Sequence, residues 1–174
     1  MTPDPQSRSD PAADPTVPPA PEARGAALAE AVDEEWAFRV VVAVRSDDLD
    51  PNGHVRGSAY LAYGDHARWA ALDAAGVEPA DLRARRIGPV NLETTLRYHR
   101  ELRPHDAVEV VTAFEWGTGR TSRVRQQLRR GDGVLAAEVS SVGGLLDLDT
   151  RRLLPDPGRY WLAIAARPEL LGLG

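Results

Sequence analysis

The sequence lacks two residue types on which much covalent enzyme chemistry depends. None of the 174 residues is cysteine, and all 21 basic residues are arginine, so lysine is absent as well. Without cysteine there can be no disulfides, thiolate metal ligands or cysteine nucleophiles. Without lysine, Schiff-base chemistry and Ser-Lys pairs are excluded. A GC-rich genome explains the preference for arginine as well as any function does.

The sequence also has no net positive charge and no long apolar run. The formal net charge of -5 disfavours nucleic-acid binding, which needs a basic surface. No stretch approaches the roughly 20 apolar residues of a membrane-spanning helix, so no membrane contact is expected. The first 20 residues contain prolines and aspartates where a secretion signal has basic and apolar segments. These features predict a cytoplasmic protein.

Several sequence signatures of nucleophile, cofactor and metal sites are missing. There is no G-x-S-x-G elbow, Walker motif or dinucleotide-binding glycine pattern. His54, His66, His99 and His105 do not have the spacing of metal ligands. We therefore expect neither a cofactor nor a metal site.

Residues 1–32 are rich in proline and alanine, and the first aromatic residue is Trp36. Such a segment buries too little apolar surface to offset its ordering entropy. It is predicted to be a disordered tail, with Pro21 to Val32 as a candidate helix. A functional tail and a simple extension both stay open. Residues 33–174 form the predicted domain.

The domain opens with a strand, a turn and a long helix. Trp36 to Val44 is rich in β-branched and aromatic residues, and residues 47–54 are dense in turn formers. Alanine-rich residues 57–75 predict a helix, with Ser58 as N-cap and Gly76 as C-terminal stop. Because this helix is apolar over most of its circumference, it is expected to be largely buried.

Apolar and polar residues alternate through most of the remaining chain, as in half-buried antiparallel strands. Strands are predicted at residues 91–98, 107–116, 121–130 and 134–147, with glycine-containing hairpin turns at 117–119 and 131–133. Residues 151–154 are a candidate extension of the last strand, and residues 157–166 a short terminal helix. This order predicts an α+β fold in which four strands form a meander around the helix.

The turn itself carries a recognisable motif, Asp48-Leu49-Asp50-Pro51-Asn52-Gly53-His54-Val55. It is followed in the helix by Tyr60, Tyr63 and Ala67-Arg68, and further on by segments 102–106 and 149–155. Over residues 36–156 the chain resembles the 4-hydroxybenzoyl-CoA thioesterase branch of the hotdog superfamily. The resemblance implies a hotdog fold, an antiparallel sheet wrapped around one long central helix.

The resemblance also implies a site and a substrate class. Asp50 takes the place of the family's catalytic carboxylate, as base or nucleophile, and the backbone N–H of Gly57 takes the place that polarises the thioester carbonyl. His54 is a candidate for orienting water or the carboxylate. The implied substrate is an acyl thioester of coenzyme A or acyl carrier protein, bound by a homodimer or homotetramer whose subunits share sites.

Arg56, Ser58 and Tyr60 are candidates for substrate binding. Many relatives have Asn-Asn after the motif, whereas this chain has Arg56-Gly57. Arg56 would then meet a phosphate or stay in solvent.

Each candidate also has a structural interpretation. Asp50 precedes a proline and can simply cap a turn, and His54 can bond to the backbone. Ser58 suits an N-cap better than a nucleophile, and Tyr60 and Tyr63 suit packing between helix and sheet. Four arginines read as a solvated strand face or as phosphate ligands: Arg123, Arg125, Arg129 and Arg130.

Two other functions stay open. One is a hotdog dehydratase or hydratase, although the Asp/His pair that such chemistry needs is not evident. The other is a non-catalytic module that binds acyl-CoA, although the acidic, proline-rich N-terminal segment does not resemble a DNA-binding region.

Overall fold

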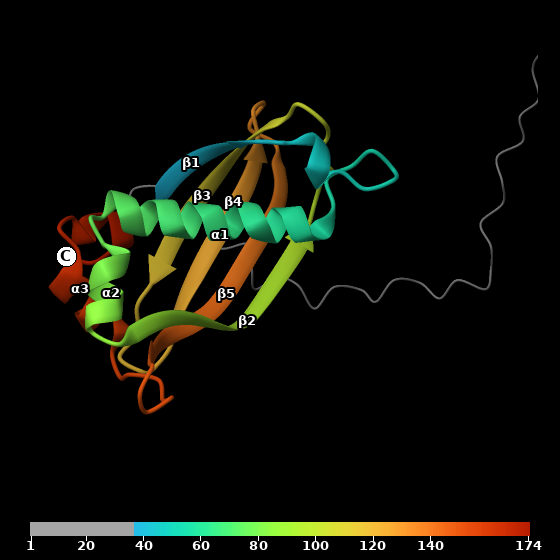
Figure 1. Ribbon diagram of the computed structural model, residues 1–174. Helices are drawn as coiled ribbons and strands as arrows, with labels where there is room; N and C mark the ends of the chain where they lie inside the picture. Colours follow the sequence, from blue (N-terminus) through green and yellow to red (C-terminus); the bar gives the residue numbers. More distant parts are fainter. Residues whose placement is uncertain (1–36) are drawn as a thin grey trace, which may run out of the picture. The chain divides into compact units, whose positions relative to one another are not determined.

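The computed structural model describes residues 37–174 (Figure 1). The predictions for the tail, residues 1–32, fall on residues outside this part. The strand predicted from Trp36 to Val44 is confirmed at Phe38–Ala43, and only its first residue lies outside. In the described part, five antiparallel strands form one sheet, and a long helix lies against it. The predicted α+β hotdog layout is therefore confirmed.

The sheet has the spatial order β1-β3-β4-β5-β2. Its strands are β1 (Phe38–Ala43), β2 (Ile87–Tyr98), β3 (Ala107–Glu115), β4 (Ser122–Arg130) and β5 (Leu135–Asp147). The predicted four-strand meander is wrong, because β2 pairs with β5 and not with β3. Only β3, β4 and β5 form a meander, since the segment after β2 carries the chain across to the far side of the sheet. As a result, β1 and β2 are the two edge strands.

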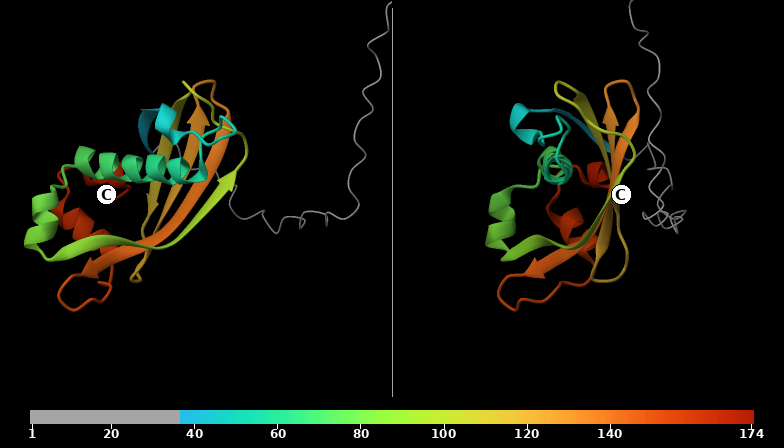
Figure 2. Two further views of the ribbon diagram at one scale, coloured as in Figure 1. Left: turned by 45° about the vertical axis from the view of Figure 1, so that its right-hand side comes forward. Right: turned by 90° about the vertical axis from the view of Figure 1, so that its right-hand side faces the viewer.

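Helix α1 (Gly57–Ala74) lies in the hollow of the curved sheet, as the end-on view of Figure 2 shows. The predicted helix is confirmed, but Ser58 is not its N-cap. Arg56 holds that position, and no side chain caps the N-terminus. At the other end Gly76 has φ +77°, the left-handed conformation that ends helices, so the predicted C-terminal stop is confirmed.

Only one face of α1 is buried, which corrects the expectation of a largely buried helix. The buried residues are Ala59, Tyr60, Tyr63, Gly64, Ala67, Ala71 and Leu72. Leu61 and Trp69, on the other side, are 38% and 51% exposed. The sheet curls around one side of the helix and leaves these apolar side chains uncovered.

The space between α1 and the sheet holds two separate apolar cores. One surrounds the N-terminal half of α1 and includes Val55 and Leu128, while the other surrounds the C-terminal half and includes Leu145 and Trp161. Buried Gln126 lies between them. Its amide nitrogen donates to the Gly64 carbonyl (2.8 Å) and to Thr112 Oγ1 (3.0 Å). A polar bridge therefore fixes the middle of the helix to the sheet.

Short helices close the C-terminal end of α1. They are α2 (Pro79–Ala84), α3 (Pro157–Ile164) and the 3-10 turn η2 (Pro168–Leu171). The terminal helix was predicted, whereas α2 was not. The proposed strand at 151–154 is absent, because Leu153 forms only a single bridge to Leu146. None of the helices in residues 37–174 is both long and apolar enough to cross a membrane.

Candidate functional site

The motif folds into a tight hairpin directly before α1 (Figure 1). The Arg56 N–H donates to the Asp48 carbonyl (2.9 Å), and the Asp50 N–H donates to the His54 carbonyl (2.8 Å). Gly53, at the tip, has φ +79°, which a glycine adopts without strain. The dense cluster of turn formers therefore makes a defined loop that leads into the helix.

Asp50 is held at the tip of this hairpin by backbone donors. Its Oδ1 accepts from the N–H groups of Asn52 (2.8 Å) and His54 (3.1 Å). The His54 N–H does most to lower the pKa of the Asp50 carboxyl, with Asn52 adding to the effect. The Asn52 side chain also hydrogen-bonds to this carboxylate. The Asp50 side chain is thus oriented and ionised.

Asp48, the other acidic residue of the motif, anchors the hairpin. Its Oδ2 accepts from Tyr63 Oη (2.7 Å) and from the Arg45 N–H (3.0 Å). Burial alone would raise the pKa of Asp48, but the hydrogen bonds from Tyr63 and Arg45 outweigh it and lower that pKa. Because Tyr63 belongs to α1, this contact fixes the turn relative to the helix.

The N-terminus of α1 is open. Arg56, Gly57 and Ser58 are all exposed. In the described part of the chain, no acceptor meets the Gly57 N–H, and no side chain caps the helix. Helix N-termini carry unpaired N–H groups and the positive end of the helix dipole. This end of α1 can therefore receive an oxygen atom that carries negative charge.

The ring of His54 points to a residue that the sequence analysis did not identify. His54 Nε2 lies 2.9 Å from Glu101 Oε2, and Arg103 Nε donates to the other oxygen of Glu101 (2.6 Å). His54 thus contacts Asp50 through its backbone, while its ring pairs with Glu101. Glu101 lies 47 positions beyond His54, and no local pattern marks it.

Two tyrosines stand between this hairpin and the sheet. Tyr60 is 3% exposed, and its Oη accepts from the Leu102 N–H (3.1 Å). Burial, the largest cause, raises the pKa of Tyr60. Tyr98, at the end of β2, meets the Tyr60 ring edge-on, with ring centroids 5.1 Å apart. These tyrosines, with His54 and Glu101, line a surface pocket of about 290 Å³.

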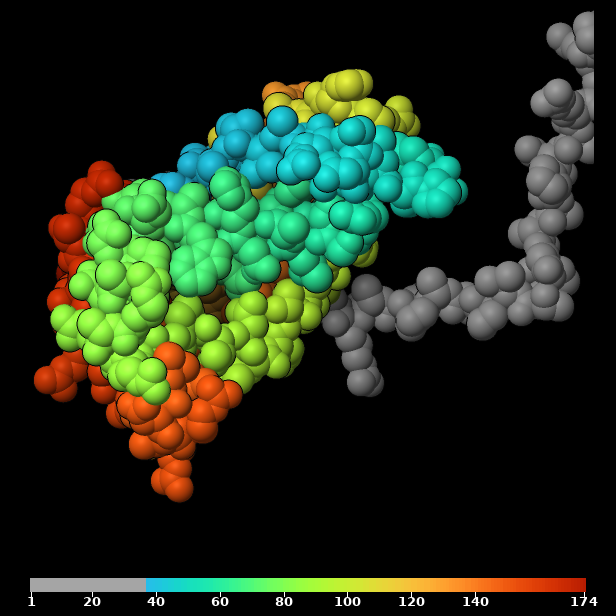
Figure 3. Space-filling view, viewed as in Figure 1, coloured from blue at the N-terminus to red at the C-terminus, as the bar shows by residue number. Residues whose placement is uncertain are grey.

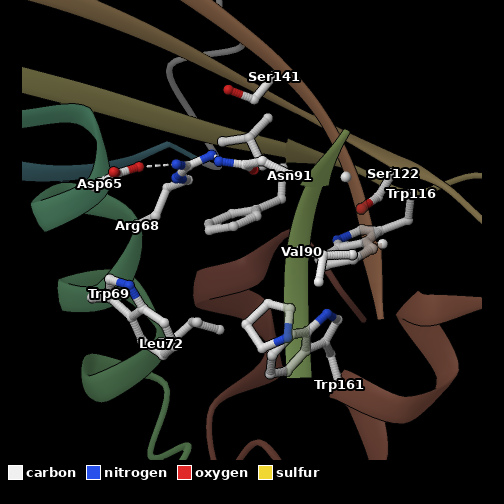
Figure 4. A pocket seen from close by; sticks show the side chains of 15 residues that line it. Asp65, Arg68, Trp69, Leu72, Val90, Asn91, Trp116, Ser122, Ser141 and Trp161 are labelled. Atoms are coloured by element: carbon white, nitrogen blue, oxygen red, sulfur yellow. Dashed lines mark hydrogen bonds and ion pairs between the residues drawn. The ribbon is translucent and has the colours of Figure 1, made fainter. Parts of the chain in front are cut away.

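A second cavity, of about 220 Å³, lies over the other half of α1, between the helix and β2. Figure 3 shows the hollow between these two elements. Large aromatic side chains form much of its wall: Trp69, Phe114, Trp116 and Trp161. Its floor is lined by small residues of the sheet, Ser122, Ser141 and Gly143 (Figure 4). Because the side chains of the wall are large and apolar and those of the floor are small, the cavity has room for an apolar group.

One side of this aromatic cavity is polar. The Arg68 side chain is 16% exposed and forms an ion pair with Asp65. Its second terminal nitrogen donates to Asn91 Oδ1 (3.0 Å). Figure 4 shows these three side chains along one edge of the cavity. Arg68 follows the motif in the sequence, but no pattern along the chain marks it as lining a cavity, because the cavity forms only when helix and sheet come together.

The arginines of β4 make local contacts. Arg123 donates to Ser140 Oγ (3.0 Å) and lies 3.9 Å from Glu115, which also pairs with Arg125. Arg129 donates to Gln127 Oε1 (2.8 Å), and Arg130 pairs with Asp132 at 2.5 Å. This pattern favours the solvated strand face over a phosphate site. Within residues 37–174, no group of three or more His, Asp or Glu side chains is placed to hold a metal.

Comparisons with known proteins place this fold. A family model described as the thioesterase-like superfamily matches residues 44–168, and no curated protein sequence matches the chain. Similar solved structures include a 1,4-dihydroxy-2-naphthoyl-CoA thioesterase from Synechocystis, with 15% identity and a TM-score of 0.67 over 74% of this chain and 95% of that one.

Two further structures are similar. Protein SAV2348 from Staphylococcus aureus, in complex with CoA, has 19% identity and a TM-score of 0.66 over 73% of this chain and 82% of that one. The 12:0-ACP thioesterase from Umbellularia californica has 20% identity and a TM-score of 0.64 over 72% of this chain and 48% of that one. Because the family model spans well over half of the sequence, the chain belongs to the thioesterase-like superfamily.

Proposed function

We propose that this protein hydrolyses an acyl thioester of coenzyme A or acyl carrier protein. The observation that carries the proposal is the placement of an ionised, oriented Asp50 seven residues before an uncapped helix N-terminus. Thioester hydrolysis needs both a group that acts on water or carbon and donors for the developing oxyanion. Asp50 and the Gly57 N–H supply one each.

In the proposed reaction, Asp50 Oδ2 accepts a proton from water as the water oxygen bonds to the carbonyl carbon. The electrons of the C=O double bond move to oxygen, next to the Gly57 N–H. When the double bond re-forms, the C–S bond breaks, and the thiolate leaves and takes up the proton. Direct attack by Asp50 would break the C–S bond and give a mixed anhydride, while the released thiolate takes up a proton from solvent. Water would then cleave the anhydride to the acid and the free Asp50 carboxylate.

His54 and Glu101 have positioning roles in this proposal. The His54 N–H orients Asp50, while the ring of His54 is held by Glu101. This ties the hairpin to the segment that follows β2. The exposed side chains of Arg56 and Ser58, at the mouth of the same site, are proposed to meet the carrier, and a phosphate is the natural partner of Arg56. Tyr60 lines the pocket as a packing residue.

The aromatic cavity is proposed to receive the acyl group, but not from the Asp50 of its own chain. Gly57 and Arg68 are about 16 Å apart along the helix at about 1.5 Å per residue. Buried Gln126 and fully buried Ala67 fill the interior between them. An acyl group at the Gly57 N–H therefore has no internal route to this cavity.

A second copy of the chain would bring the two halves together. The outer edge of β2 is unpaired among the described strands. Tyr98 contacts Gly57 at one end of β2, and Pro89 and Val90 line the cavity near the other. Antiparallel pairing of two β2 strands sets opposite ends side by side. The proposed site then combines the hairpin of one protomer with the cavity of its partner in a homodimer or homotetramer.

The test is turnover of a panel of acyl-CoA and acyl-carrier-protein substrates, followed by reaction of the released thiol with a chromogenic reagent. The panel should run from benzoyl and hexanoyl to palmitoyl groups. Release of thiol that depends on protein concentration is expected for at least one member. Binding without release across the panel would instead identify a non-catalytic acyl-CoA module, and the proposed hydrolysis would be wrong.

A further inference from the structure

The hydroxyl of Tyr98 lies against the first residue of α1. A Cβ atom built on Gly57 would stand 2.5 Å from Tyr98 Oη and 3.7 Å from the ring carbon that bears it. Real Cβ atoms do not approach other atoms as closely as 2.5 Å. Only glycine therefore fits at position 57 while the Tyr98 hydroxyl stays where it is.

The ring of Tyr98 is held in this place by a rigid neighbour. It meets Tyr60 edge-on at 90°, and Tyr60 is itself buried and fixed by the Leu102 N–H. Tyr98 as a whole is nevertheless 56% exposed. The contact thus fixes the aromatic body and leaves the polar end in the pocket next to the hairpin.

The Tyr98 hydroxyl differs from those of its two neighbours. Tyr60 Oη accepts from the Leu102 N–H, and Tyr63 Oη donates to Asp48. Within residues 37–174, Tyr98 Oη has no hydrogen-bond partner, and neither does the Gly57 N–H. Two donors without a partner, the Tyr98 hydroxyl and the Gly57 N–H, therefore lie close together at the helix N-terminus.

We propose that Tyr98 is a catalytic residue, whose Oη–H donates a second hydrogen bond to the thioester carbonyl oxygen held at the Gly57 N–H. This rests on the hydrolase function proposed above. No bond of the phenol breaks. The hydrogen bond strengthens as charge moves onto the carbonyl oxygen, and an oxyanion is stabilised best by donors already in place. Position 57 then matters twice: its backbone N–H donates, and the absence of a side chain leaves room for the Tyr98 hydroxyl.

The experiment begins with Tyr98→Phe, which keeps the ring contact with Tyr60 and removes only the hydroxyl. Loss of one oxyanion donor lowers kcat by about 10²-fold, with KM changed by less than about threefold. The melting temperature should not move. Tyr160→Phe, the same chemical change in α3, is the matched control and should keep wild-type kcat.

A double variant separates chemistry from space. Gly57→Ala alone should be severely impaired, because its new methyl group strikes the Tyr98 hydroxyl. When Gly57→Ala is combined with Tyr98→Phe, the ring carbon that bore the hydroxyl lies 3.7 Å from the new methyl group, which is an ordinary contact. The double variant should therefore be no slower than Tyr98→Phe alone.

Two results would overturn the proposal, and they differ. If wild-type protein turns over acyl thioesters and Tyr98→Phe keeps kcat within about twofold, the hydroxyl is not a donor in the reaction, while the hydrolase function stands. If wild-type protein releases no thiol from any substrate, both the function and this role of Tyr98 are wrong.

Discussion

The two ends of α1 differ in the kind of surroundings they have: polar at the N-terminus and aromatic at the C-terminus. At the N-terminus the helix is uncapped, and His54 and Tyr98 line a surface pocket beside the hairpin that holds Asp50. At the C-terminus Gly76 closes the helix, and aromatic side chains surround a cavity with one neutralised polar edge. The first end has the unpaired donors and acceptors that bond breaking needs. The second has an apolar cavity, which under the proposed function would select an acyl group by its size.

The largest effect is expected from removing the negative charge at the N-terminal end. Asp50→Asn keeps size and hydrogen-bonding capacity, and kcat should fall by about 10²–10⁴-fold with a smaller change in binding. Measuring kcat and KM on the best substrate checks this. Asp47→Asn, the control in the same turn, should lose less than about tenfold. A wild-type rate for Asp50→Asn would remove Asp50 from the mechanism, and loss of activity through unfolding would make it a structural turn residue.

The next test is whether the two ends act across a subunit interface. Leu92 interrupts the pairing of β2 with β5 and is 55% exposed on the edge strand. Leu92→Asp places a charge on this edge and should give a monomer by analytical ultracentrifugation, with kcat/KM reduced at least about tenfold. Val41→Asp is the control, because Val41 is 64% exposed on the opposite edge strand. A fully active monomer would show that each protomer holds a complete site.

A milder change tests the recognition end directly. Ser122→Leu fills part of the floor of the aromatic cavity and should raise KM for acyl substrates about tenfold, with kcat nearly unchanged.

A site shared between two subunits also predicts complementation between two impaired variants. Random mixing of Asp50→Asn with Ser122→Leu subunits leaves one intact site in each mixed dimer, so up to about a quarter of wild-type activity at low substrate should return. No recovery in purified mixed dimers would place both residues in one protomer's site.

The smallest expected effect is on pH dependence. The His54 N–H holds the pKa of Asp50 below its ordinary value of 3.8, so the carboxylate is fully ionised at every pH well above 3.8. The value of kcat should therefore not fall as the pH is lowered from about 8 to about 5. A decline of kcat within this range would show that a group other than Asp50 controls the acid side of the profile.

The same shifts predict how stability changes with acid. The folded-state pKa values of Asp48 and Asp50 lie below their unfolded values. Their contribution to the free energy of unfolding is therefore complete above about pH 4 and is lost as pH falls through the lower folded values. Thermal melts between pH 3 and 7 would detect this loss at the acid end only.

Local pattern was enough to predict most elements of the fold. Alternation identified β3, β4 and β5, and alanine content with Gly76 bounded α1. The place of β2 could not be predicted, because strand order depends on which edges meet and alternation carries no such information. Helix α2 was missed because its six residues are too few to show a helical period.

The candidate site divides in the same way. The hairpin around Asp50 follows from its own turn formers, so the sequence was sufficient to locate it. Tyr98, the last residue of β2, and Glu101, just beyond it, lie next to this hairpin and the start of α1. In the aromatic cavity, Asn91 of β2 meets Arg68 of α1. Their proximity depends on the curl of the sheet around α1, which no spacing along the chain expresses.

The bridge from Gln126 to Gly64 bears on how the protein can change over time. Because a buried amide fixes α1 at its midpoint, side chains can be exchanged in one apolar core without repacking the other. Under the proposed function, the indole-lined half could change with the acyl group while the hairpin half is kept. Randomising Phe114, Val124 and Trp161 should yield folded proteins of altered acyl preference. Gly64→Ala would place a methyl group 2.7 Å from the Gln126 amide oxygen and displace this bridge. A change in one apolar core would then affect the other.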